Sequence, residues 1–106
     1  MRLQGKTALV TGAADDRSIG WGIARALAEE GANVVVNDIS QPEKLAQRVN
    51  DLQQIGVGGL AVQADVTDPD AVDDMIRKTI DTFGQLDIVA SNAGIIRWEN
   101  FLDITP

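Results

Sequence analysis

Residues 6–25 read K-T-A-L-V-T-G-A-A-D-D-R-S-I-G-W-G-I-A-R, and they predict how this part of the chain folds. The first residues form a short apolar run typical of a buried strand, which ends at Gly12. A loop of small and polar residues follows, and Ser18 then opens a pattern of helical period. A helix N-terminus favours a bound anion, because its first amides lack acceptors and the helix dipole is positive there. The stretch therefore predicts a phosphate-binding loop.

The composition limits the protein class and its partners. The 106 residues suffice for one domain at most, and 44% of them are hydrophobic, as in ordinary globular domains. A net charge of −7 argues against nucleic acid or an anionic membrane as the partner, since both bind clustered Lys and Arg. The sequence has no cysteine and no histidine, so we expect neither a disulfide nor a metal site. No apolar run approaches the ~20 residues of a membrane span, and residues 1–6 lack a signal-peptide pattern. We therefore expect a cytoplasmic protein.

Strand-like and helix-like patterns alternate along the chain. Strands are expected at 7–11, 33–38, 60–64 and 87–90, and helices at 19–30, 43–54 and 69–83. The residues expected to face the core are Ile19, Ile23, Ala26 and Leu27 in the first helix, and Val72, Met75, Ile76 and Phe83 in the third. Repeated units of this length predict an α/β fold, a parallel sheet with right-handed crossovers and helices on both faces.

Polar residues or glycines follow each expected strand. Asp38 ends the second strand, roughly 20 residues past the glycine loop, where an acid can bind the ribose of a dinucleotide. An acid there also repels a 2′-phosphate, which favours NAD over NADP. Asp65 and Val66 follow the third strand, within reach of an adenine, and Asn92-Ala93-Gly94 follows the fourth. Each of these features is also compatible with an ordinary cap or turn. Because parallel strands end at one edge of the sheet, their coincidence predicts one ligand site there.

These motifs together resemble the short-chain dehydrogenase/reductase family. The similarity rests on Thr11-Gly12-Ala13-Ala14, Ile19-Gly20, Asp38, Asp65-Val66 and Asn92-Ala93-Gly94, and it covers residues 6–106. The resemblance implies a Rossmann-type sheet of strand order 3-2-1-4, a nicotinamide dinucleotide, and hydride transfer to or from an alcohol or carbonyl. It also implies the cofactor contacts: Gly12, Ser18, Ile19 and Gly20 at the pyrophosphate, Asp38 at the ribose, Asp65 and Val66 at the adenine, and Asn92, Ala93 and Gly94 beside the cofactor. The N–H groups of Ser18 and Ile19 are expected to point at the pyrophosphate.

The sequence departs from the family pattern in two ways. Its loop is two residues longer than the common T-G-x-x-x-G-x-G, and Ser18 stands at the middle glycine, which is similar to the enoyl-acyl-carrier-protein reductase branch. The Asn-Ala-Gly motif belongs to the commoner branch, although Ser91 precedes it where Asn is usual, so the substrate class stays open. The family's catalytic Ser, Tyr-x-x-x-Lys and supporting Asn would lie beyond Pro106, and the chain has no tyrosine. No catalytic residue is therefore identified, and the chain alone is expected to be inactive.

The end of the sequence carries a large apolar load. Residues 95–104 are rich in Ile, Trp, Phe and Leu, and Thr105-Pro106 has the pattern of a helix start. We expect residues 1–106 to be a partial Rossmann domain, truncated before the catalytic half and incomplete at the edge of the fourth strand. We also expect a homo-oligomer that associates through this edge and the C-terminal segment.

The leading prediction is the NAD-binding portion of a short-chain oxidoreductase. Four alternatives stay open: a fragment of an enoyl-acyl-carrier-protein reductase-like NADH reductase, a non-catalytic module that binds an adenine nucleotide, an adenosylmethionine methyltransferase, and a fragment that binds nothing. The Thr11-Gly12 start and the Asn92-Ala93-Gly94 motif argue against the methyltransferase.

Overall fold

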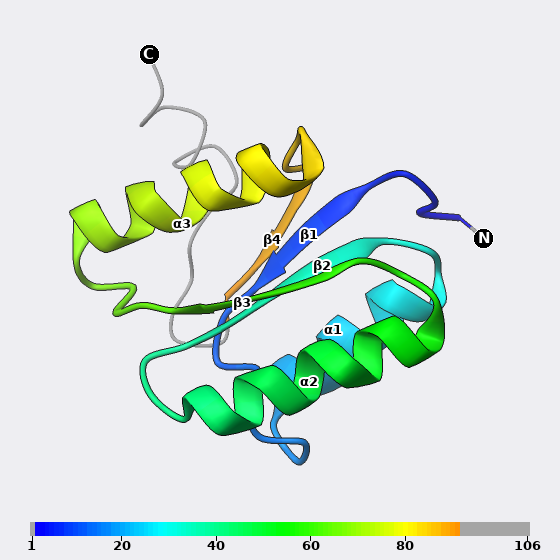
Figure 1. Ribbon diagram of the computed structural model, residues 1–106, viewed down its shortest axis with the longest axis horizontal. Helices are drawn as coiled ribbons and strands as arrows, with labels where there is room; N and C mark the ends of the chain where they lie inside the picture. The colour runs from blue at the N-terminus through cyan, green and yellow to red at the C-terminus, as the bar shows by residue number, and fades with distance from the viewer. Residues whose placement is uncertain (1, 92–106) are drawn as a thin grey trace.

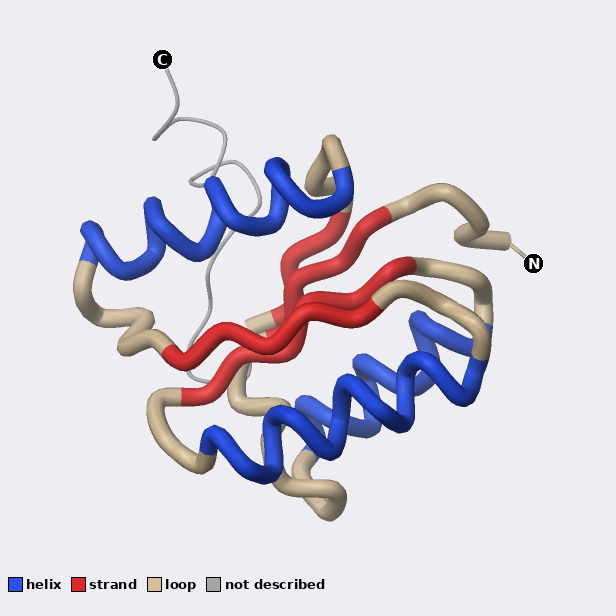
Figure 2. The backbone as a smooth tube through the Cα atoms, in the orientation of Figure 1, coloured by secondary structure: helices blue, strands red, loops and turns tan. Residues whose placement is uncertain are grey.

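A computed structural model describes residues 2–91, which form a four-stranded parallel sheet between two layers of helices (Figure 1). In chain order the elements are β1 (Thr7–Val10), α1 (Ile19–Glu29), β2 (Asn33–Asp38), α2 (Pro42–Ile55), β3 (Gly59–Gln63), α3 (Pro69–Phe83) and β4 (Ile88–Ala90). The strand order is β3-β2-β1-β4, as predicted. Helices α1 and α2 cover one face of the sheet and α3 covers the other (Figure 2).

The two faces of the sheet carry separate core clusters, because successive side chains of a strand point to opposite sides. Val34 and Val36 of β2 pack with Leu45 and Leu52 on the side of α1 and α2. Val35, between them in sequence, belongs to the cluster that contains Met75 of α3. Strands buried on both faces need continuous apolar runs, which explains the three consecutive valines of β2.

The element boundaries follow the local signals in the sequence. The Asp68 carboxylate caps α3 by accepting a hydrogen bond from the Asp70 N–H at 3.0 Å, and Pro69 occupies the first helical position. Gly84 ends this helix in the left-handed region, with φ +82°. The predicted strand and helix ranges therefore agree with the structure to within a residue or two at each end.

The predicted buried face of α1 is wrong for three of its four residues: Ala26 is exposed, as are Ile19 and Ile23, and only Leu27 packs against the core, where it is partly buried. Ile19 is 70% exposed and Ile23 is 37% exposed, whereas the buried residues are Gly20, Trp21, Ala24 and Ala28. Small residues spaced four apart let α1 approach the sheet closely, and this close approach decides which face is buried. The prediction gave most weight to large apolar side chains such as Ile19 and Ile23, and it therefore placed the wrong side of the helix against the sheet.

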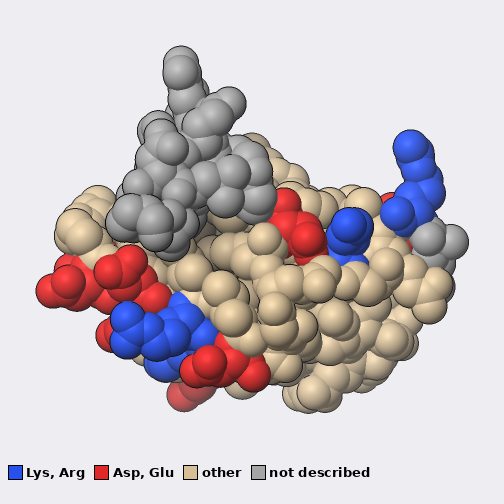
Figure 3. Space-filling view, turned by 90° about the horizontal axis from the view of Figure 1, so that it is seen from above, with Lys and Arg blue, Asp and Glu red and all other residues tan. Residues whose placement is uncertain are grey.

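Helix α3 presents a mixed face to the sheet. Met75 is buried as predicted, but Thr79 is also buried, while Val72 and Ile76 are only partly buried. Figure 3 shows charged side chains of both signs gathered over this helix, whose charged residues are Asp70, Asp73, Asp74, Arg77, Lys78 and Asp81. Within residues 2–91, β4 is the last strand on its side of the sheet. The segment 95–104 lies outside the described residues.

Candidate functional site

Residues at the carboxyl ends of β1, β2 and β3 enclose a cavity of about 200 Å³. Its lining residues are Thr11, Gly12, Asn37, Asp38, Ile39, Ala64, Asp65, Val66 and Thr67. The structure thus brings together Gly12, Asp38, Asp65 and Val66, which the sequence predicts as a single site. The carboxyl ends of parallel strands are where open α/β sheets bind ligands.

The glycine loop packs against the first turn of α1. Gly12 has φ +64°, in the left-handed region that favours glycine. A Cβ added to Gly20 would lie 2.4 Å from the Gly12 carbonyl oxygen and 2.8 Å from the Thr11 carbonyl oxygen. Both obstacles are backbone, so only glycine fits at position 20. This contact brings the N-terminus of α1 next to the cavity residue Gly12.

Ser18 begins α1 and also closes the loop. Its hydroxyl accepts a hydrogen bond from the Trp21 N–H at 3.0 Å and donates one to the Asp15 carbonyl at 2.7 Å. The Ser18 N–H donates to the same Asp15 carbonyl at 3.0 Å. Without a ligand the loop itself therefore uses the Ser18 N–H, and its predicted aim at a pyrophosphate stays a prediction. The N–H groups of Ile19 and Gly20 belong to the first turn, where amides lack an intrahelical acceptor.

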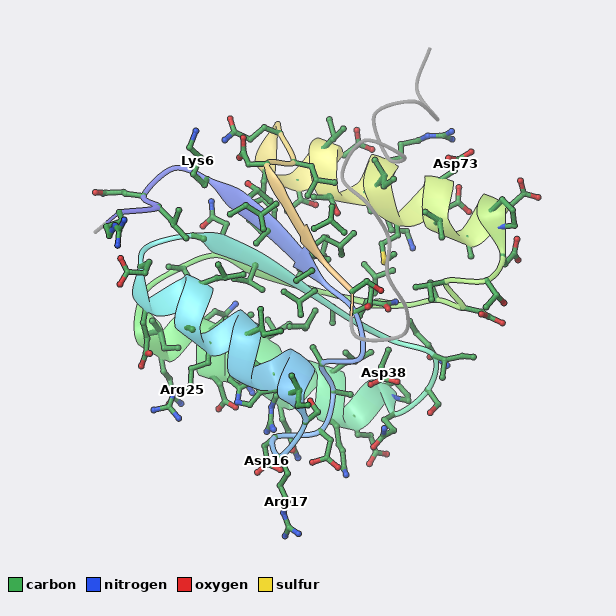
Figure 4. All side chains as sticks on the ribbon, turned by 180° about the vertical axis from the view of Figure 1, so that it is seen from behind. Lys6, Asp16, Arg17, Arg25, Asp38 and Asp73 are labelled. Carbon is green, nitrogen blue, oxygen red and sulfur yellow. The ribbon has the colours of Figure 1, made fainter. Side chains whose placement is uncertain are left out.

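Asp38 links β2 to the glycine loop. Its Oδ2 accepts a hydrogen bond from the Ala14 N–H at 3.2 Å, and its Oδ1 accepts one from the Ile39 N–H at 2.9 Å. Figure 4 shows Asp38 at the end of the sheet near the loop that carries Asp16 and Arg17, with Lys6 at the opposite end. Two amides thus hold a carboxylate at the edge of the cavity.

Asp65 forms a turn at the end of β3 and also lines the cavity. Its Oδ1 accepts hydrogen bonds from the Thr67 hydroxyl at 2.7 Å and the Thr67 N–H at 2.9 Å. The Thr67 hydroxyl and then the Thr67 amide lower the pKa of this carboxyl below its ordinary value. The carboxylate is therefore ionised at neutral pH. The turn and site interpretations of Asp65 are compatible, because Oδ1 makes the turn and Oδ2 is left for another donor.

Two polar residues of the site were missed by the sequence analysis. Asn37 is 1% exposed, and its side-chain amide donates to the Val62 carbonyl at 3.0 Å and the Ala64 carbonyl at 3.2 Å. The sequence signal for Asn37 was a polar side chain directly after three valines of a buried strand, where it needs hydrogen-bond partners. Thr67 was also missed, because its position two residues after Asp65 acquires meaning only in the turn.

The strand end that precedes the fourth predicted feature, Asn92-Ala93-Gly94, is within the described residues, although the feature itself is not. The Thr11 hydroxyl donates to the Ser91 hydroxyl at 3.3 Å, and the Thr11 N–H donates to the Ala90 carbonyl at 3.0 Å. These bonds join the ends of β1 and β4, where the order of the strands reverses. Asn92, Ala93 and Gly94 lie outside the described residues.

Within residues 2–91, every helix is too short or too polar to span a membrane. In the same range, acidic side chains, which are the only ones of the usual metal-binding types present, do not form a group that could hold a metal ion.

The parallel sheet, the glycine loop and the acid-lined cavity define a Rossmann-type nucleotide-binding fold. Residues 12–106 match the family model described as Enoyl-(Acyl carrier protein) reductase. The chain belongs to the short-chain dehydrogenase/reductase family.

The curated relatives are longer proteins. Versicolorin reductase of Emericella nidulans is 47% identical over 105 residues, which are 99% of this chain and 39% of the relative. The 3-oxoacyl-(acyl-carrier-protein) reductase of Staphylococcus aureus is 48% identical over 92 residues, which are 87% of this chain and 37% of the relative. The chain therefore spans less than half the length of these proteins.

Solved structures agree with this membership. A short-chain dehydrogenase from Burkholderia cenocepacia, in complex with NADP, has a TM-score of 0.82 and 42% sequence identity. The match covers 92% of this chain and 39% of that structure. An NAD+-bound xylitol dehydrogenase has a TM-score of 0.80 and 33% identity, over 90% of this chain and 35% of that structure. The similarity thus includes proteins with either form of the cofactor.

Proposed function

We propose that the chain is the cofactor-binding part of an oxidoreductase that transfers hydride between a nicotinamide dinucleotide and an alcohol or carbonyl substrate. Family membership and the cavity at the strand ends support this proposal. The chain spans about 39% of the versicolorin reductase relative and contains neither tyrosine nor histidine. We therefore propose that the groups that perform the chemistry lie outside residues 1–106, so that this chain binds the cofactor without turnover.

The observation that carries the proposal is the Asp38 carboxylate at the cavity. A carboxylate offers acceptors to the hydroxyls of an adenosine ribose, and its charge repels a 2′-phosphate. The Ala14 N–H, 3.2 Å from Asp38 Oδ2, restrains this group before any ligand arrives. We propose that the chain prefers NAD to NADP for this reason.

The remaining cavity residues fit the adenosine end of a dinucleotide. The volume of about 200 Å³ is below the roughly 300–1,000 Å³ of pockets that hold a whole ligand, so one end of the molecule is accommodated. Asp65 and Val66 would lie at the adenine, and Asn92, Ala93 and Gly94 beside the nicotinamide half. Gly12 and the first-turn amides of Ile19 and Gly20 would hold the pyrophosphate. The bound cofactor would supply or accept the hydride, while these residues bind and orient it.

A second candidate concerns the substrate of the whole protein. The long Ser18-Ile19 loop and the description of the matching family model favour an enoyl-thioester substrate and NADH. Against this, the relatives of 47% and 48% identity carry the names of a versicolorin reductase and a 3-oxoacyl-thioester reductase. An alcohol or carbonyl substrate therefore remains our first proposal.

Titration calorimetry tests the proposed binding. NAD should bind the folded chain, NADP should bind more weakly, and adenosylmethionine should give no heat above dilution. Failure of a folded chain to bind any of the three compounds would contradict the proposal. In a parallel assay with NADH, turnover of a simple ketone by the chain alone would contradict our placement of the chemistry outside it.

We also propose that the chain self-associates. Support comes from β4, which is the last strand on its side of the sheet within residues 2–91 and so leaves backbone groups for pairing. Light scattering should give a mass above the monomer's 11.3 kDa, and a monomer at all concentrations would contradict this. A cytoplasmic location is a prediction from the sequence and completes the proposal.

A further inference from the structure

Two basic side chains of α2 contact the acidic part of the long glycine loop. Lys44 Nζ lies 3.5 Å from Asp15 Oδ2, and an Arg48 guanidinium nitrogen lies 4.0 Å from Asp16 Oδ2. Asp15 and Asp16 belong to the loop that is two residues longer than the common pattern. Helix α2 therefore contacts this loop through charge, although it is not part of the cavity.

Arg48 is held firmly in place. The residue is 8% exposed, and its guanidinium carbon lies 5.4 Å from the centroid of the Trp21 ring. Its Nε lies 3.1 Å from Asp51 Oδ2, an ion pair whose N–H direction does not make a hydrogen bond. These contacts form one wall of an open groove of about 560 Å³ between α1 and α2. Arg48 therefore presents a fixed positive charge to Asp16, whose own side chain is 66% exposed.

Asp15, the partner of Lys44, connects α2 to the start of α1. Its Oδ1 accepts a hydrogen bond from the Arg17 N–H at 2.9 Å, and its carbonyl accepts from both the Ser18 N–H and hydroxyl. The Arg17 amide, followed by Lys44, lowers the pKa of the Asp15 carboxyl, which is therefore ionised at neutral pH. A displacement of Asp15 would move Ser18, and with it the first amides of the helix.

We propose that Lys44 and Arg48 are positioning residues. They hold the loop of residues 13–18 in the conformation that points the N-terminus of α1 at the pyrophosphate. The proposal rests on the proposed dinucleotide function, whereas the loop contacts exist without a ligand. An exposed ion pair shifts an equilibrium by no more than about fivefold, so the two pairs are expected to act together.

Trypsin offers a direct test, because Arg17 is exposed and lies within the loop. Lys44→Met with Arg48→Met should speed cleavage at Arg17–Ser18 about fivefold, with unchanged cleavage after Arg77 and Lys78 of α3. Met at position 48 keeps an apolar contact with Trp21. Asp16→Asn, a change on the exposed partner, should speed the same cleavage without touching the core. Arg25→Met is the matched control, since Arg25 lines the same groove but pairs with Glu29 of its own helix at 3.5 Å.

Two results would overturn the proposal: an unchanged cleavage rate at Arg17–Ser18 in the double variant, or an equal increase at all sites, which would report general unfolding. Binding supplies the second readout. The double variant should weaken NAD about fivefold and leave adenosine, which has no pyrophosphate, unchanged in an NMR titration. Equal weakening of both ligands would also contradict a role at the loop. If the wild-type chain binds neither ligand, the proposed function fails, and the cleavage rates still decide whether α2 holds the loop.

Discussion

The Asp38 carboxylate accepts a hydrogen bond from the Ala14 N–H across 3.2 Å, which joins the end of β2 to the loop after β1. A backbone hydrogen bond between the same two segments, from the Ala13 N–H to the Asn37 carbonyl at 2.9 Å, strengthens this connection. The loop and the acid are therefore positioned relative to each other by the fold itself. A ligand would meet a site whose parts are already in place, which lowers the entropy cost of binding.

Gly20→Ala should destabilise the protein and impair cofactor binding. The new Cβ would lie 2.4 Å from the Gly12 carbonyl oxygen, and backbone cannot move aside cheaply. We expect a loss on the order of 3 kcal/mol in the free energy of unfolding, measured by urea denaturation. Gly22→Ala, on the same helix, meets nothing within 4 Å and should stabilise by about 0.5–1 kcal/mol. Equal effects of the two substitutions would contradict the close approach of α1 to the loop.

Asn37→Leu should weaken the junction between β2 and β3. The substitution leaves the Val62 and Ala64 carbonyls without their side-chain donor, at a cost of about 2 kcal/mol. Affinity for adenosine should fall as well, because Ala64 and Asn37 both line the cavity. Thr79→Val is the control. Its buried hydroxyl donates to the Met75 carbonyl of its own helix, which keeps its backbone donor, so denaturation should change by less than about 0.5 kcal/mol. A neutral Asn37→Leu would show that the amide does not hold the strand ends.

Thr67→Val should raise the pKa of Asp65 toward its ordinary value of 3.8, because the hydroxyl is the largest cause of its depression. A carboxyl with a depressed folded pKa contributes stability that is fully present above the unfolded pKa and is lost as the pH falls through the folded pKa. Acidification below about pH 4 should therefore destabilise the wild type slightly more than the variant. NMR titration of the Asp65 carboxyl measures the shift directly, and Asp15 serves as the internal reference. An unchanged Asp65 titration would show that the Thr67 hydroxyl is not the cause.

Much of the fold could be predicted because its signals are local. Asp68-Pro69 and Gly84 mark the ends of α3, and the valines of β2 mark a strand buried on both faces. The use of local signals also explains why the buried face of α1 was predicted wrongly. Helical periodicity favours Ile19 and Ile23, but the small face of the helix is buried because Gly20 must approach the Gly12 carbonyl.

The candidate site was predictable where each residue follows its own strand, as Asp38 and Asp65 do. The role of Asn37 was not predictable in this way, because it depends on the register that places Asn37 opposite Val62 of β3. The hydrogen bond of the Ser18 N–H within the loop was not predictable for a similar reason. Only the folded loop places the Asp15 carbonyl 3.0 Å from that amide.

The central claim is that Asp38 recognises the adenosine ribose of NAD. Titration calorimetry of the wild type and Asp38→Asn with NAD and NADP tests it most directly. The substitution removes the charge and keeps a side chain of similar size. We predict that NAD affinity falls about tenfold or more in the variant, while NADP affinity falls less or improves. The loss of one acceptor for the Ala14 or Ile39 N–H affects both dinucleotides alike. The loss of charge, in contrast, weakens the contact with the ribose hydroxyls of NAD and removes a repulsion from the 2′-phosphate of NADP. An equal loss of affinity for both dinucleotides would contradict the assignment of Asp38 to the ribose.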